Sequence, residues 1–65
     1  MARLLPSDFD LTGLEHSERR VCEAMLHGLD DTWLVIPTVP IFDQGDAEID
    51  LVLVSPTQGV VLVEV

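Results

Sequence analysis

The sequence predicts a small α/β domain in which one helix precedes a group of strands. An amphipathic pattern covers residues 14–29 and predicts the helix. Two apolar runs at residues 47–54 and 60–65, separated by turn-forming residues, predict a β-hairpin. The chain has 65 residues, and a domain of this size buries only about 60% of its unfolded surface. One small domain is therefore the most that it can form.

The predicted helix begins at a capping box. Thr12 and Glu15 have the required spacing, in which the Thr12 hydroxyl accepts a hydrogen bond from the backbone N–H of Glu15. Residues 1–11 precede this cap and contain turn formers, so they predict an irregular leader. We therefore place the domain at residues 12–65.

Two prolines shape the segment after the helix. Pro37 and Pro40 join the short apolar segments 33–36 and 39–42, and a turn is predicted at residues 43–46. Because proline cannot donate a hydrogen bond to a neighbouring strand, this region predicts an edge strand or an irregular approach.

The hairpin strands 47–54 and 60–65 are apolar at consecutive positions. This pattern is typical of strands that are covered on both faces of a layered α/β sheet. A single helix covers one face only. We therefore expect the second cover to lie outside this sequence, and the chain to be the N-terminal half of a longer domain.

The composition excludes several classes of protein. The net charge is −9, with three arginines, no lysine and twelve acidic residues, so a basic nucleic-acid-binding surface is excluded. The single cysteine excludes an internal disulfide, and 48% hydrophobic residues argue against intrinsic disorder. No apolar run is long enough for a secretory signal or a membrane span, so we expect a cytoplasmic protein.

One acidic residue lies within the apolar stripe of the helix. On a helical wheel Glu18 falls near the middle of a stripe about 140° wide. A buried acid needs a partner or loses its charge. Two interpretations stay open, a buried functional acid and an acid near the helix start that bends out to solvent.

Each hairpin strand also carries one isolated acid. Asp50 is the only charged residue between Ile49 and Val54, and Glu64 is the only one between Val60 and Val65. A hairpin centred on Thr57 pairs Val54 with Val60 and Asp50 with Glu64. Opposed carboxylates about 5 Å apart repel each other unless a cation lies between them, and Mg²⁺ is typically held by one or two carboxylates. A register shifted by one residue would instead place the two acids on opposite faces.

Three segments resemble a known family. Residues 17–21, 47–54 and 59–65 read SERRV, AEIDLVLV and GVVLVEV. In this order they resemble the nuclease-related domain (NERD) family of the PD-(D/E)XK, or restriction-endonuclease-like, superfamily. That pattern has a helical Glu, then E-I-D with an apolar run, then G-V with an apolar run that ends in E-V-K. The resemblance covers about residues 15–65.

The resemblance implies a fold and a set of site residues. The fold would be a restriction-endonuclease-like α/β/α core, of which the first helix and first strands are present. Glu18, Asp50 and Glu64 would be catalytic, and Asp50 and Glu64 would bind Mg²⁺ or Mn²⁺ for phosphodiester hydrolysis. The Lys of E-x-K would follow Val65, so we expect the chain to be incomplete and inactive on its own.

The resemblance also implies partners. Nucleic acid would be bound through parts of the parent protein outside this sequence. The opening residues 1–6 look like the starts of longer proteins in which a NERD domain precedes a superfamily 1 helicase. The leading hypothesis is a metal-dependent nuclease domain in a DNA-processing protein. The alternatives are a non-catalytic module of the same fold that docks or positions a larger protein, and an inert fragment that does not fold alone.

Overall fold

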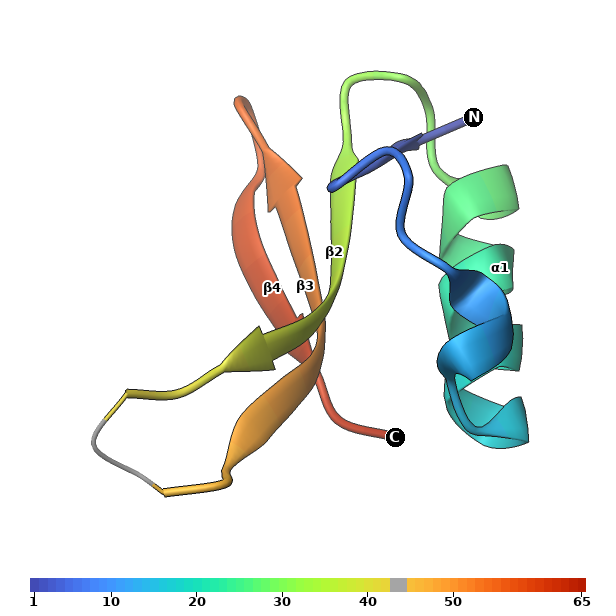
Figure 1. Cartoon of the computed structure of the whole chain (residues 1–65). Helices are drawn as coiled ribbons and strands as arrows, with labels where there is room; N and C mark the ends of the chain where they lie inside the picture. The colour runs from blue at the N-terminus through green and yellow to red at the C-terminus, as the bar shows by residue number, and fades with distance from the viewer. Residues whose placement is uncertain (43–44) are drawn as a thin grey trace.

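The structure, a computed structural model, describes residues 1–42 and 45–65. These residues form an α-helix and a short 3₁₀ helix beside a four-stranded mixed sheet (Figure 1). The fold class is α/β, as predicted. In chain order the elements are β1 (Arg3–Leu4), η1 (Leu11–Gly13), α1 (His16–Gly28), β2 (Leu34–Pro40), β3 (Glu48–Ser55) and β4 (Gly59–Val63).

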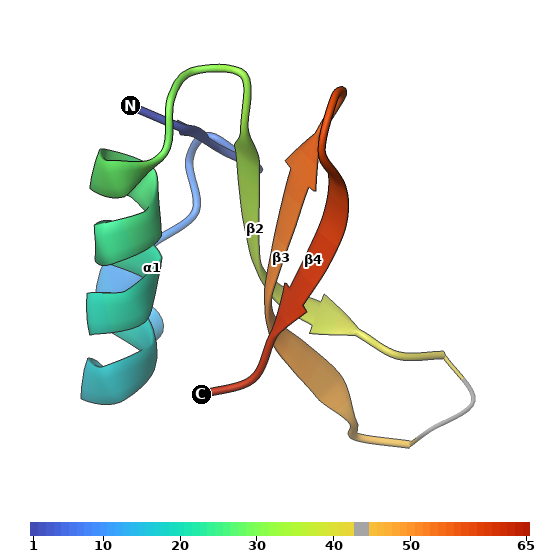
Figure 2. The ribbon, with the colours of Figure 1, turned by 180° about the vertical axis from the view of Figure 1, so that it is seen from behind.

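The strands lie in the sheet in their sequence order, β1-β2-β3-β4. β1 runs parallel to β2, and the other neighbours are antiparallel. The helix α1 lies beside the sheet, and Figure 2 shows the same arrangement from behind. No helix among the described residues is long and apolar enough to cross a bilayer.

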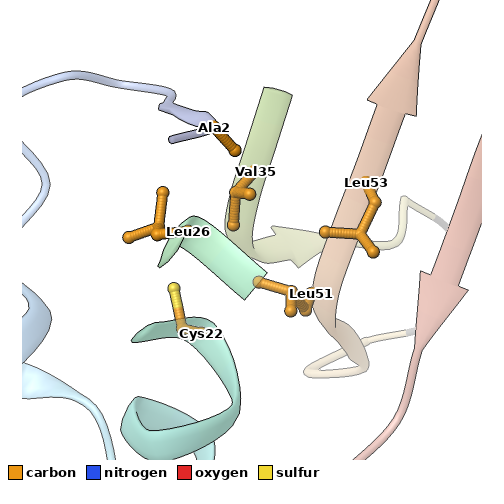
Figure 3. Close-up of a cluster of buried hydrophobic side chains, with 6 residues drawn as sticks. All are labelled: Ala2, Cys22, Leu26, Val35, Leu51 and Leu53. Atoms are coloured by element: carbon orange, nitrogen blue, oxygen red, sulfur yellow. The ribbon is translucent and has the colours of Figure 1, made fainter. Parts of the chain in front are cut away.

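The core lies between α1 and the central strands (Figure 3). It joins the apolar side of the helix to β2, β3 and the start of the chain, through Ala2, Cys22, Leu26, Val35, Leu51 and Leu53. Cys22 is 1% exposed and unpaired, so it is a small core residue. Burial raises the pKa of its thiol, and a buried thiol of this kind is inert.

The helix begins later than predicted. Its N-cap is Glu15, whose side chain makes no capping hydrogen bond, so the capping box at Thr12 is wrong. Thr12 belongs to η1 instead, where its backbone N–H and its hydroxyl both donate to Asp10 Oδ1. An aspartate two residues earlier is a strong local acceptor. Thr12 is therefore hydrogen-bonded to Asp10 and does not cap α1.

The N-terminal leader is more ordered than predicted. Arg3 and Leu4 form β1, and the backbone N–H of Ala2 donates to the carbonyl of Leu26 at 2.8 Å. Ala2 itself is only 6% exposed. The leader therefore ties the C-terminal end of α1 to the sheet.

The proline-containing segment is one strand rather than two. β2 pairs with β3 along its length, whereas β1 pairs with it only at Leu34 and Val35. Pro37 and Pro40 both lie where β2 has a strand on one side only. A missing N–H is tolerated there, which explains why two prolines fit. Residues 43 and 44 of the predicted turn lie outside the described residues.

The final strand is largely uncovered. Val60 is 63% exposed and Leu62 is 60% exposed, whereas residues 51–53 of β3 are buried at consecutive positions. The prediction of strands covered on both faces therefore holds for the middle of β3. It does not hold for β4 within the described residues.

Candidate active site

The β3–β4 register is the one that the sequence predicts. Val54 pairs with Val60 and Val52 with Leu62, and the pairing ends at Leu51 with Val63. The alternative register, shifted by one residue, is therefore wrong. Continued by one step, the same register places Glu64 opposite Asp50, although Glu64 lies just past the end of β4. That the two side chains share a face of the hairpin stays a prediction.

The tight turn between the two strands fixes this register. Ser55 is 3% exposed, and its hydroxyl oxygen accepts the backbone N–H groups of Thr57 at 3.3 Å and Gln58 at 3.2 Å. Gly59 has a φ of 95°, a backbone conformation that glycine adopts readily and residues with a side chain rarely adopt. Both residues close the loop at a defined length, which fixes the β3–β4 register down to the Leu51–Val63 pair.

Asp50 also contacts the chain segment that carries Glu64. Its Oδ2 accepts the backbone N–H of Val65 at 2.9 Å, although the two residues lie 15 positions apart. The segment after β4 turns toward α1 (Figures 1 and 2). The half-buried Asp50 carboxylate is thus oriented by a backbone donor next to Glu64, whose side chain is exposed.

A strained residue lies across the sheet from Asp50. Thr38 sits between the pairs Pro37–Leu51 and Val39–Ile49 and has a φ of 55°. A β-branched residue at positive φ is a backbone outlier, and such conformations typically cost about 1–3 kcal/mol. Beyond this position β2 and β3 curve away from α1 (Figure 1). Asp50 therefore lies where the sheet bends.

Glu18 approaches the same region from the helix. It lies in the first turn of α1 and is half-buried. It is therefore neither the fully buried acid nor the fully solvated acid that the sequence left open. Partial desolvation raises the pKa of its carboxyl, and the negative charge of Asp50 raises it further. The charges of Glu15 and Glu48 act on Glu18 in the same direction.

These acids do not form a preassembled cage. Within residues 1–42 and 45–65, no three His, Cys, Asp or Glu side chains gather closely enough to hold a metal ion together. The arrangement instead offers a strand carboxylate, Asp50, with Glu64 at the adjoining chain segment and Glu18 on the facing helix.

Comparison with known families gives a clear result. The family model described as "NERD: Nuclease-related domain" matches residues 14–65. The chain belongs to the nuclease-related domain family. The match includes Glu18, Asp50 and Glu64, and it begins after β1 and η1. No curated protein and no solved structure matches the chain significantly.

Membership of the NERD family gives the chain a nuclease-related function. Sequence reasoning missed two features of this candidate site, the positive φ of Thr38 and the hydrogen bond from the Val65 backbone N–H to Asp50. The two prolines around Thr38 were the available signal for the first, since they indicate an irregular strand path.

Proposed function

We propose that this NERD domain is a metal-dependent nuclease in which Asp50 and Glu64 bind Mg²⁺ or Mn²⁺ and Glu18 completes the acidic site. Its partner is nucleic acid, and its reaction is phosphodiester hydrolysis. The observation that carries the proposal is the hairpin register, which would place Glu64 opposite Asp50 if it continued one step past the Leu51–Val63 pair. The hydrogen bond between Val65 and Asp50 supports it, because it holds that chain segment against β3.

The residues fit a hard divalent cation. Two carboxylates supply oxygen donors, the ligand type that Mg²⁺ prefers, and Mg²⁺ usually completes its shell with water and substrate phosphate. One hydrogen bond from Val65 leaves Asp50 further lone pairs, since a carboxylate has about four acceptor sites. A bound ion would supply charge stabilisation at the phosphate and lower the pKa of a bound water.

The chain's own residues would orient and tune this site. The Val65 N–H fixes the rotation of the Asp50 carboxylate, and the bend at Thr38 sets the direction of β3 there. Desolvation and the charge of Asp50 raise the pKa of Glu18, so Glu18 holds a proton more readily than an ordinary glutamate does. Proton transfer at such a site is most effective when the pKa lies close to the working pH.

The test uses Asp50→Asn, because asparagine keeps an acceptor for the Val65 N–H and removes the charge. Melting curves with and without Mg²⁺ are paired with cleavage of labelled DNA and RNA, for this chain and for a longer protein that carries it. An ion that binds only the folded state stabilises it by about 2.7 kcal/mol at 100 times its Kd. We expect the wild type to show such a shift and Asp50→Asn to lose it together with cleavage.

Glu48→Gln is the matched control. Glu48 is an exposed acid on the same strand, two residues before Asp50, so the control removes the same charge from the same neighbourhood. It should keep the metal-dependent shift and the cleavage. Equal behaviour of Asp50→Asn and Glu48→Gln would contradict a metal site at Asp50.

One observation favours a second candidate function. The exposed apolar side chains of β4 suit a non-catalytic NERD module that docks onto a larger nucleic-acid-processing protein. Absence of both the Mg²⁺-dependent shift and cleavage in the wild-type longer protein would favour this alternative.

A further inference from the structure

A groove runs between the first half of α1 and the end of the chain. Its volume is about 350 Å³, and it is lined by Ser17, Arg20, Val21 and Ala24 with Val65 on the other side. Arg20 and Val21 each lie three or four positions from both Ser17 and Ala24, so the four residues share one side of α1. Ligand-binding pockets start at about 300 Å³, so the groove is large enough for a phosphate group and part of a nucleotide.

Arg20 is the cation of this groove. Within the described part of the chain the ion pair joins Arg19 to Glu23 at 2.9 Å, and Arg20 takes no part in it. Arg3, the third arginine, lies in β1 beside the opposite end of α1 (Figures 1 and 2). In a chain of net charge −9 a phosphate is repelled except where an arginine is available. Arg20 meets that condition at the groove.

The groove adjoins the candidate active site. Val65, which lines it, donates its backbone N–H to Asp50 and directly follows Glu64. A nucleic-acid strand with one phosphate at these acids would therefore place a neighbouring phosphate near Arg20. The planar guanidinium binds phosphate through two parallel hydrogen bonds, and the Ser17 hydroxyl supplies a further donor.

We propose that Arg20 and Ser17 form a phosphate subsite that holds the nucleic-acid backbone next to the scissile position. The inference rests on the proposed nuclease function and adds a residue that positions the substrate. The apolar groove residues Val21 and Ala24 then contact the sugar. This explains how a strongly acidic domain keeps a polyanion at its acidic site.

The experiment compares Arg20→Gln with Arg19→Gln, which removes the same charge from the neighbouring residue. Binding of fluorescent single-stranded DNA and RNA to the 65-residue chain is measured by anisotropy in EDTA at several salt concentrations. A charge-assisted contact to phosphate corresponds to a loss of about tenfold or more in affinity. Arg20→Gln should show this loss and lower the salt slope by about 0.7–0.9. Arg19→Gln should stay within about twofold, because exposed charges are screened over roughly 8 Å at physiological salt.

Two further measurements separate a subsite from general electrostatics. Titration with inorganic phosphate should shift the amide NMR signals of Ser17, Val21 and Ala24 in the wild type and not in Arg20→Gln. Arg20→Lys should keep the salt slope and recover part of the affinity, since lysine retains the charge without the two-pronged geometry.

Several results would overturn the subsite. These are unchanged affinity and slope in Arg20→Gln, an equal loss in Arg19→Gln, or phosphate-induced shifts that lie away from the groove. Because every measurement is made without metal, the nuclease function can fail separately. Arg20-dependent binding without Mg²⁺-dependent cleavage supports the subsite and contradicts the nuclease.

Discussion

Leu51 links the hairpin to the helix, and its truncation should remove much of the stability of the domain. The side chain is 2% exposed and belongs to the core cluster with Leu26 and Val35. Leu→Ala at a buried site typically costs about 2–5 kcal/mol, depending on how far the cavity collapses. Because the core is small and its cover, α1 with the N-terminal segment, can relax into the cavity, we expect about 2–3 kcal/mol for Leu51→Ala. A chain of this length has roughly 3–10 kcal/mol in total.

Urea unfolding at low protein concentration measures this loss. Trp33, the only tryptophan, packs against the core cluster, so its fluorescence reports on the core. Leu62→Ala is the control, because it makes the same substitution on the adjacent strand at a side chain that is 60% exposed. We expect Leu62→Ala to stay within about 0.5 kcal/mol of the wild type. Equal shifts of the two unfolding midpoints would refute the assignment of Leu51 to the core.

Two further predictions concern charge and the exposed strand. Glu18→Gln should raise the unfolding free energy at neutral pH, because a folded-state pKa above the ordinary value of 4.5 makes the charged carboxylate unfavourable. The gain over the wild type should vanish in melting curves well below pH 4.5, where the wild-type carboxyl is protonated in both the folded and the unfolded state. A gain that persists at that pH would contradict this explanation. Val60→Lys should suppress self-association through β4, since Val60 is 63% exposed on an apolar strand and lysine protects such edges. Sedimentation at increasing concentration checks this, and a wild type that stays monomeric throughout would refute it.

The helix and the hairpin could be predicted because their patterns are local. Apolar periodicity marks α1, and the turn after Ser55 separates two apolar runs. The predicted start of the helix was wrong because a competing contact decides it. Thr12 is hydrogen-bonded to Asp10, and the helix starts at His16. β1 was missed because two residues have no periodicity. Its formation depends on the pairing of Arg3 with Leu34, which lies far along the chain.

The candidate site was predictable to the same extent. A short turn sets the register of a hairpin, so the β3–β4 pairing as far as Leu51 with Val63 could be predicted, whereas a shared face for Asp50 and Glu64 stays a prediction. The strained Thr38 could not, because a backbone dihedral depends on how the whole strand bends. The groove at Arg20 could not either, since an arginine on a helix surface has the same pattern whether it faces solvent or lines a cavity.

The order of strands in the sheet also implies an order of folding. β3 and β4 are joined by a tight turn, and β2 precedes β3 directly, so these pairings close short loops. β1 must reach across the whole helix to pair with β2, a contact between Arg3 and Leu34. Contacts that close short loops form first, because less chain entropy is lost. Asp50 and the segment that follows β4 would therefore come together early, before the N-terminus has docked and closed the core.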